Sequence, residues 1–250
     1  MRTLPPEVLE ALRPLGTSLI ADAIETFRIR MANEGFIRSG VVQDLTPSLD
    51  PMLGYAATAR VRTVHPPMKG AAFTENSAWW RYLTTLPEPR VVVLHDFNHR
   101  PGLGAFLGEL HTAVHKALNC VGVVTNGAVR DLAAIRASGF RCFAGHISMT
   151  RCYAHVVEFG IPVEIGGLLI QPGDLLYGDS NGVIAIPLDH AARIPVVAAD
   201  IRAKKQKTIE LCRSQDFSLE KLEALTKAFG FLVAESGAQL APDLEKPSDA

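Results

Sequence analysis

The chain has 250 residues, of which 48% are hydrophobic and 20% are charged, so it is long and apolar enough to bury one substantial core. Its formal net charge of -1 gives no overall positive field, which argues against a nucleic acid as partner. We therefore expect one main globular domain that binds no nucleic acid.

The N-terminal sequence and the cysteines indicate the compartment. The stretch MRTLPPEVLEALRPLG contains prolines and carboxylates where a signal peptide needs unbroken apolar residues, and no later apolar run reaches the length of a membrane span. We expect a cytoplasmic protein without a membrane segment. No C-x-x-C pair occurs, and we interpret four cysteines as buried free thiols: Cys120, Cys142, Cys152 and Cys212.

The first third of the chain is expected to be helical and then extended. Residues 8–12 and 18–29 have helical character, with Thr17-Ser18 capping the second helix. A strand over 54–64 must end at Pro66-Pro67, because two successive prolines remove the N–H donors that a ladder needs. Residues 72–86 are then predicted to form a helix.

Residues 90–139 predict a strand-helix-strand-helix unit. Buried strands are expected over 90–96 and 120–127, and helices over 103–119 and 130–139, the last ending at Gly139. Such a unit implies parallel strands joined by a right-handed crossover. Polar groups then gather where strands end and helices begin.

The remainder of the chain is expected to form hairpins and then helices. Short apolar runs interrupted by Gly and by Pro172-Gly173-Asp174 predict antiparallel pairs, so the sheet should be mixed. Residues 189–212 are predicted to be helical, with Pro195 in the first turn, and a last helix should follow its cap, Ser218. The polar tail from residue 237 is expected to be peripheral or to contact another subunit.

Two short segments carry the candidate chemistry. Arg130-Asp131 follows a buried strand, and Gly108-Glu109-Leu110-His111 lies near the start of the preceding helix. If the two strands are neighbours, both helix starts open on one cleft. An Asp that starts a helix is also an ordinary cap, so the spacing alone leaves a structural role open.

Several motifs in order resemble those of the 4-hydroxy-4-methyl-2-oxoglutarate aldolases and their relatives, the regulators of ribonuclease E activity A. The resemblance covers residues 15–212 and rests on the following segments: Thr17 to Ala23, Gly108-Glu109-Leu110, Gly122-Val123-Val124, Asn126 to Asp131, Pro162-Val163, Gly166-Gly167, Pro172-Gly173-Asp174 and Asp179 to Val183. It implies a layered α/β domain of the swivelling β/β/α type over residues 1–212. Residues 213–250 would be a helical extension.

The resemblance also implies a site and an assembly. Asp131 would hold Mg²⁺ or Mn²⁺, Arg130 would bind the keto oxygen of pyruvate or its enolate, and Glu109 would lie beside the metal's waters. Gly108 and the backbone N–H groups of Leu110 and His111 would receive the carboxylate of a 2-oxo acid. Homotrimers or homohexamers are implied, with active sites at subunit contacts.

General chemistry is consistent with these roles. Cleavage beside a keto acid's methylene leaves an enolate, whose negative charge must be stabilised where it develops. A divalent cation and an arginine can do this without a Schiff base. We therefore expect a class II pyruvate aldolase, with oxaloacetate decarboxylation as a further activity, and keep a non-catalytic regulator as the alternative.

Two positions depart from the aldolase pattern. An acid often stands three places after the metal-binding Asp, where this chain has Ala134. The family's late helix often carries Lys-Glu, where this chain has Lys205-Gln206, with Glu210 the nearest acid. These departures leave metal affinity and the carbonyl half of the substrate open.

Other patterns favour structural roles. His111 and His115 have zinc-ligand spacing, but no third ligand follows, and we expect a partly exposed helix face. His95, Asp96 and His99 follow a strand and could line the cleft or supply a proton donor, but we expect them to form a solvated loop. Lys69 and Lys116 lie in polar or surface settings that would not activate an amine for a Schiff base.

Overall fold

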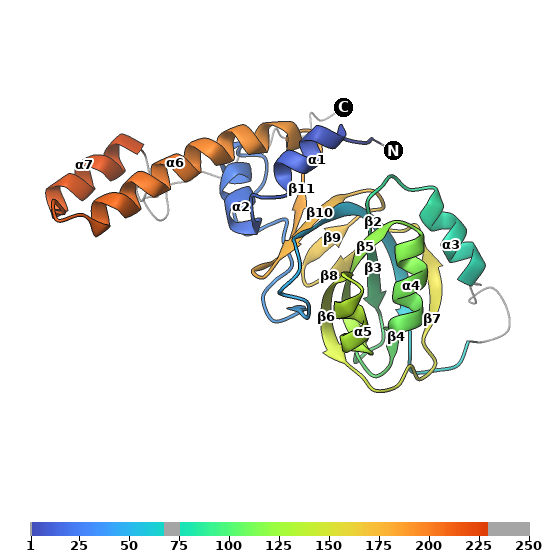
Figure 1. The fold of residues 1–250 in the computed structure, drawn as a ribbon. Helices are drawn as coiled ribbons and strands as arrows, with labels where there is room; N and C mark the ends of the chain where they lie inside the picture. Colours follow the sequence, from blue (N-terminus) through green and yellow to red (C-terminus); the bar gives the residue numbers. More distant parts are fainter. Residues whose placement is uncertain (1, 68–75, 230–250) are drawn as a thin grey trace, which may run out of the picture. The chain divides into compact units, whose positions relative to one another are not determined.

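The computed structural model of the protein describes residues 2–67 and 76–229 (Figure 1). Their contacts form two compact groups, one of residues up to 17 together with 35–192, and one of residues 18–34 together with those from 193 onward. The predicted domain boundary at residue 212 stays a prediction. The predicted helix start at residues 72–75, Lys69 and the polar tail lie outside the described residues.

The first group contains a mixed sheet, as expected. The largest sheet of the described residues has nine strands in the order β1-β6-β5-β3-β2-β10-β11, with β4 paired to β5 and β7 paired to β2. Its members are β1 (Gln43–Asp44), β2 (Met52–Arg62), β3 (Arg90–Asp96), β4 (Ala105–Leu107), β5 (Cys120–Val129), β6 (Arg141–Ile147), β7 (His155–Phe159), β10 (Leu175–Asp179) and β11 (Gly182–Ile186).

Pairing directions confirm the two predicted halves. Strands β2, β3, β5 and β6 are mutually parallel, so their C-terminal ends lie at one edge of the sheet. Antiparallel hairpins follow, one formed by β10 and β11 and a separate one by β8 (Val163–Ile165) and β9 (Leu168–Ile170). The sequence thus distinguished the crossover half of the fold from the hairpin half.

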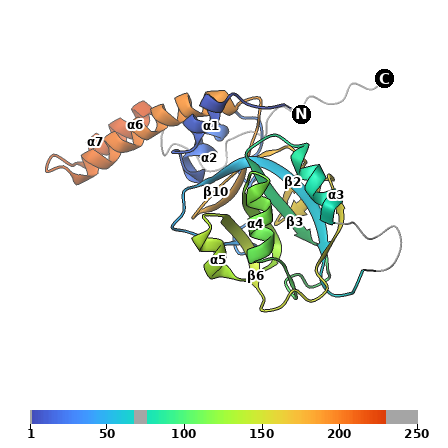
Figure 2. The same ribbon diagram turned by 45° about the vertical axis from the view of Figure 1, so that its right-hand side comes forward.

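Helices cover one face of the parallel strands and the β8-β9 hairpin packs against the other. Figures 1 and 2 show α3 (Asn76–Thr84), α4 (Glu109–Ala117) and α5 (Leu132–Ala137) on the same face. Because side chains alternate along a strand, Val92 and Leu94 of β3 belong to the core on the helix side, while Val91 and Val93 pack with the hairpin. Both faces of β3 are therefore buried.

The predicted helix over 103–119 was wrong in its first part. Residues Ala105–Leu107 form β4, whose Ala105 and Leu107 are in register with Ala128 and Val129 of β5. All three residues of β4 are buried, and burial beside a neighbouring strand outweighs the helical pattern that the sequence suggested. As a result α4 begins at Glu109, with Gly108 at its N-cap position. Strand β7 was not predicted.

The second group is helical. Apart from its first residue, α2 (Thr17–Thr26) belongs to it, with α6 (Ile194–Arg213) and α7 (Leu219–Phe229). Lys205 of α6 forms an ion pair with Asp22 of α2. Pro195 lies in the first turn of α6, and the hydroxyl of Ser218 accepts a hydrogen bond from the N–H of Lys221, so both predicted helix starts are confirmed.

Across residues 2–67 and 76–229, no helix has both the length and the apolar character that a membrane span requires.

The cysteines were only partly predicted. Cys120 and Cys142 are buried, and burial raises the pKa of each thiol to about 12. Cys212 is exposed and Cys152 is partly exposed, so the prediction of four buried thiols was wrong for these two. Cys212 is in α6 of the helical group, where it lies on an exposed surface.

His115 is a core residue, so the predicted partly exposed face for this histidine was wrong. Its side chain is fully buried, and its Nε2 accepts a hydrogen bond from Nε1 of Trp79 at 3.1 Å. The Nδ1 therefore carries the proton and donates to the backbone carbonyl of His111 at 2.6 Å. Burial lowers the pKa of His115 to about 4. A neutral imidazole thus joins α3 to the first turn of α4.

Protonation of His115 in the unfolded chain should couple stability to pH. The pKa is lower in the folded protein than the ordinary value near 6.5, so stability is lost as the pH falls from about 6.5 towards 4. We expect urea unfolding to show that, between pH 7.5 and pH 5, the wild type loses about 2 kcal/mol more stability than the His115→Gln variant. An identical loss in both proteins would contradict a neutral buried imidazole.

A buried ion pair fastens β1 to the sheet. Arg141 of β6 donates to Asp44 of β1 at 2.9 Å, and the two side chains are only 4% and 8% exposed. The same guanidinium donates to the carbonyl oxygens of Thr46 and Leu49. Asp44 also accepts the N–H of Thr46 at 2.9 Å, so one carboxylate fixes both the turn and the arginine.

Removal of the Asp44 carboxylate should be strongly destabilising, because it leaves a buried guanidinium without its counter-ion. We expect Asp44→Ala to lower the free energy of unfolding by about 3–5 kcal/mol in urea titrations. The half-exposed pair of Arg60 and Glu158 supplies the control, since Glu158→Gln should cost no more than about 1 kcal/mol. Equal losses of unfolding free energy in the two variants would show that burial does not strengthen the Arg141–Asp44 pair.

Candidate active site

Arg130 and Asp131 follow the last residue of β5, at the C-terminal edge of the parallel strands. The N–H of Arg130 donates to the carbonyl of Leu107 at the end of β4, at 3.0 Å. Strands β4 and β5 therefore end together, and the chain leaves β4 into α4 and β5 into α5. The predicted meeting of the two helix starts is present in the structure.

Asp131 occupies the N-cap position of α5 without capping that helix. Its backbone is in the left-handed region, with φ 56° and ψ 41°, and its side chain makes no capping hydrogen bond to α5. Instead its Oδ2 accepts the N–H of Glu109, the first residue of α4, at 3.1 Å. The ordinary cap that the sequence left open is thus not what this side chain forms.

Gly108 makes the approach of these two segments possible. Its backbone is extended, with φ −145° and ψ −162°, so any residue could adopt its conformation. A Cβ at this position would, however, lie 2.5 Å from Oδ2 of Asp131 and 2.9 Å from Cγ of Arg130. Lack of a side chain, and not backbone freedom, is therefore what this site requires of residue 108.

The Arg130–Asp131 pair is loose and accessible. Nε of Arg130 lies 3.5 Å from Oδ2 of Asp131, and the two side chains are 40% and 41% exposed. No ion pair to another side chain is present for either residue within the described parts of the chain. Both groups can consequently reach a ligand without breaking a buried network.

The first turn of α4 adds backbone donors to the same place. The N–H of Thr112 is bonded to the carbonyl of Gly108 at 2.9 Å, which closes the first helical turn. The N–H groups of Leu110 and His111 precede it and have no acceptor one turn earlier in the helix. Such a terminus favours an anion, and the side chain of Leu110, 75% exposed, does not cover it.

His111 lies beside the pair and is neutral at physiological pH. Its ring stacks on Phe106 of β4, with centroids 4.9 Å apart. Burial lowers the pKa of His111, and the charges of Arg130 and Arg151 lower it further. His111 therefore adds no positive charge at the start of α4, and Arg151 was not singled out by the sequence.

Asp96 was expected in a solvated loop, and this was wrong. Its side chain is 1% exposed, and its carboxylate accepts hydrogen bonds from the N–H groups of Asn98 and Gly102 and from the side-chain amide of Asn98. Asp96 thus orders the loop after β3. His95 is partly buried, and burial lowers its pKa, whereas His99 is exposed.

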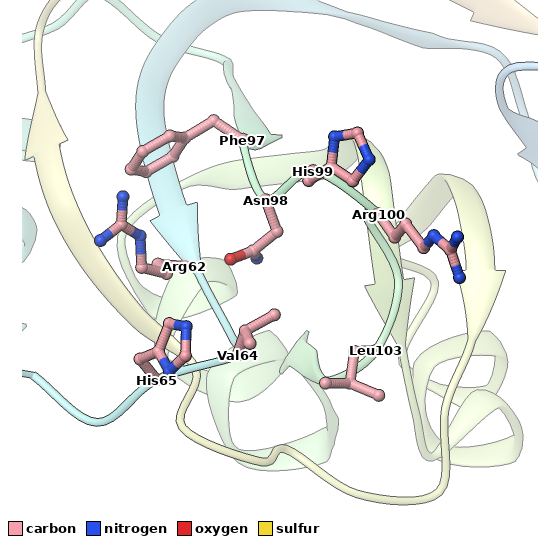
Figure 3. Close-up of a pocket in the computed structure, with 8 residues that line it drawn as sticks. All are labelled: Arg62, Val64, His65, Phe97, Asn98, His99, Arg100 and Leu103. Atoms are coloured by element: carbon pink, nitrogen blue, oxygen red, sulfur yellow. The ribbon is translucent and has the colours of Figure 1, made fainter.

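A pocket of about 650 Å³ opens beside this loop, at the C-terminal ends of β2 and β3 (Figure 3). None of the predicted site residues lines it. Its walls combine arginine, histidine and apolar side chains: Arg62, Val64, His65, Phe97, Asn98, His99, Arg100 and Leu103. The sequence analysis considered His99 as a residue that could line a cleft, but it did not predict this pocket, because no motif connects the two segments that form it.

At the two positions that depart from the aldolase pattern this chain has Ala134 and Gln206, and neither side chain carries a carboxylate. Gln206 donates to Glu210 within α6 at 2.9 Å. No cluster of three or more His, Cys, Asp and Glu side chains suited to a metal occurs among residues 2–67 and 76–229. Asp131 contacts both the first N–H of α4 and the guanidinium of Arg130.

Several known proteins have sequences similar to this chain. The chain is 30% identical over 206 residues to protein DlpA of Legionella pneumophila, an alignment that covers 81% of this chain and 31% of that protein. It is 34% identical over 84 residues to a Halalkalibacterium halodurans protein named "Putative 4-hydroxy-4-methyl-2-oxoglutarate aldolase", covering 33% of this chain and 40% of that protein. The matched regions thus span less than half the length of these relatives.

Solved structures share the fold. An uncharacterized protein from Pseudomonas syringae aligns with a TM-score of 0.69 at 22% identity, over 89% of this chain and 95% of that one. Streptomyces coelicolor RraAS2, described as an unusual member of the RNase ES inhibitor RraA family, aligns with a TM-score of 0.66 at 20% identity, over 83% and 98%. A family model described as RraA-like, Aldolase/RraA, matches residues 17–185, more than half of the sequence. The chain therefore belongs to the RraA-like family.

Proposed function

We propose that the protein is a divalent-metal-dependent pyruvate lyase. It cleaves a 4-hydroxy-2-oxo acid, such as 4-hydroxy-4-methyl-2-oxoglutarate, as a class II aldolase, and it decarboxylates oxaloacetate through the same pyruvate enolate. One observation carries the proposal: Asp131 accepts the N–H of Glu109 and lies 3.5 Å from Arg130, so a carboxylate, a guanidinium and a helix N-terminus converge.

The donors at this position suit Mg²⁺ or Mn²⁺ better than zinc. Asp131 offers a carboxylate that is 41% exposed, and its Oδ1 has no partner among the described residues. Magnesium keeps several waters and is commonly held by one or two carboxylates together with the substrate, whereas zinc prefers a set of His and Cys ligands. Asp131 would hold the ion. Glu109, which is exposed at the start of α4, would face the water molecules bound to the ion.

The chain's own groups account for binding of a 2-oxo acid. The N–H groups of Leu110 and His111 would donate to the substrate carboxylate, because the helix N-terminus carries a partial positive charge. Arg130 would donate to the keto oxygen, where the enolate charge develops as the bond to the next carbon breaks. A divalent cation held by Asp131 would supply Lewis-acid polarisation there.

A Schiff-base mechanism is not favoured by the described lysines. Lys116 is exposed and donates to the carbonyl of Ser138, so its amine is not desolvated. It lies in the last turn of α4, away from the N-terminus of that helix. A lysine nucleophile needs such desolvation, or a neighbouring cation, to lose its proton near neutral pH. Arg130 and Asp131 carry the proposal without a covalent step.

Pyruvate release is the direct test. Oxaloacetate and 4-hydroxy-4-methyl-2-oxoglutarate are each supplied with Mg²⁺ or Mn²⁺, and pyruvate is followed with a coupled dehydrogenase, with and without a chelator. Asp131→Asn and Arg130→Ala should each lower kcat/KM by at least about 100-fold, because the first removes the carboxylate that would hold the cation and the second removes the guanidinium that would donate to the developing enolate. Arg130→Ala should also raise KM.

Surface changes of the same chemistry serve as controls. Asp50→Asn and Arg81→Ala alter exposed residues away from the α4 terminus and should retain full activity. Full activity of Asp131→Asn in the presence of chelator would refute the mechanism. Absence of pyruvate release by the wild type with either substrate and either metal would leave the non-catalytic regulator as the better description.

Gly108 provides a second test of the same site. Gly108→Ala forces the new methyl group against Asp131 and Arg130, and displacement of catalytic groups by about 1 Å costs on the order of 100-fold in rate. We expect that loss in kcat/KM, with the free energy of unfolding within about 1 kcal/mol of wild type.

Leu110→Ala is the matched control for the glycine, because it changes an exposed side chain in the same turn and leaves the backbone donors in place. Its activity should stay within about twofold of wild type, the range of a change that removes no transition-state contact. A fully active Gly108→Ala variant would mean that the close approach at residue 108 has no part in the chemistry.

A further inference from the structure

The pocket at the ends of β2 and β3 has the chemistry of an anion site distinct from the Arg130–Asp131 pair. Arg62, Val64 and His65 contribute one wall, from the end of β2, and the loop after β3 contributes the other (Figure 3). Its volume of about 650 Å³ lies in the range of small-molecule sites. No acidic residue is among the lining side chains that belong to residues 2–67 and 76–229.

The two arginines of the pocket form no ion pair with the part of the chain that the structure describes. No carboxylate within the described segments lies within ion-pair distance of Arg62 or Arg100, in contrast to Arg60 on the same strand, which pairs with Glu158. Asp96 lies behind the loop, but its oxygens are occupied by Asn98 and by the N–H of Gly102. Arg62 and Arg100 together outweigh the single negative charge of Asp96. The described side chains around the pocket therefore have a net positive charge even when both histidines are neutral.

Hydrogen bonds and ring contacts hold the walls in place without a ligand. The side-chain amide of Asn98 donates to Oγ1 of Thr63 at 3.1 Å and also to Asp96, so it ties the segment after β2 to the loop after β3. The guanidinium of Arg62 lies over the ring of Phe97, 4.6 Å from its centroid. This contact orients Arg62, and no described carboxylate pairs with its N–H edge.

We propose that this pocket binds a small organic oxyanion, a carboxylate or a phosphate ester, with an apolar part. The oxyanion is held by Arg62 and by Arg100 at the rim, and the apolar part rests against Phe97, Val64 and Leu103. The site is independent of the proposed lyase activity, because it shares no residue with the Arg130–Asp131 pair.

Calorimetric titration with simple probes tests the proposal. Phenyl phosphate and phenylacetate represent the two oxyanions, and phenylacetamide is the neutral analogue of the second. Both anions should bind, the tighter one identifying the preferred headgroup, and the amide should bind at least about tenfold more weakly, because a charge-assisted hydrogen bond to arginine is lost. Chemical-shift changes at the Asn98 side-chain amide should accompany binding of the anions.

Four variants locate the binding. Arg62→Gln and Arg100→Gln should each raise Kd by at least about tenfold. Arg81→Gln, which removes the same charge from the exposed surface of α3, and Arg130→Ala should leave Kd unchanged. Arg100 is exposed, so its variant keeps the test valid even if Arg62→Gln disturbs folding.

Several results would overturn the proposal. These are the absence of binding of either anion at about 10 mM, equal affinity for the neutral amide, unchanged Kd in Arg100→Gln, or loss of binding in Arg130→Ala alone. The last result would assign the anions to the α4 terminus. Because the readout is binding of probes that are not lyase substrates, failure here is separate from failure of the lyase assay.

Discussion

The candidate active site depends on one close approach, between the carboxylate of Asp131 and the backbone at Gly108. A single methyl group at residue 108 would come within 2.5 Å of that carboxylate. The approach joins the ends of β4 and β5, so that the start of α4 and the residues after β5 form one surface. Arg130 takes part through its backbone, which is bonded to Leu107, and through its side chain, which lies beside the same carboxylate.

Burial of two histidines beside this surface determines their protonation and so the charge near the start of α4. His115 is held neutral by burial and joins Trp79 to the carbonyl of His111, so the first turn of α4 is anchored to the core. Burial and the nearby Arg130 and Arg151 lower the pKa of His111. The anchored turn therefore presents backbone donors beside arginines, without a competing imidazolium. An anion that reaches the turn meets fixed donors, and fixed donors need little reorganisation on binding.

Local patterns predicted the parts of the fold that local chemistry decides. The strand Arg90–Asp96 and the hairpins at residues 163–186 follow from apolar runs and turn residues, and the position of Arg130-Asp131 after a parallel strand follows from chain order. Strand β4 and the burial of His115 and Asp96 were missed because their partners are distant in sequence. His115, for example, is buried by a hydrogen bond to a tryptophan 36 residues away. The direction of the Asp131 side chain depends in the same way on Glu109, 22 residues before it.

The conformation of Asp131 bears on the choice between lyase and binding module, which the shared fold cannot decide. A non-glycine residue in the left-handed region costs on the order of 1 kcal/mol, and an unused N-cap forgoes about as much again. A position that carries both costs is a candidate for function, because neither cost is recovered in α5. This conformation directs the Asp131 carboxylate to the start of α4, beside Arg130. A surface that only docks on a partner has no need of that arrangement, whereas a lyase that must hold a cation next to an enolate does.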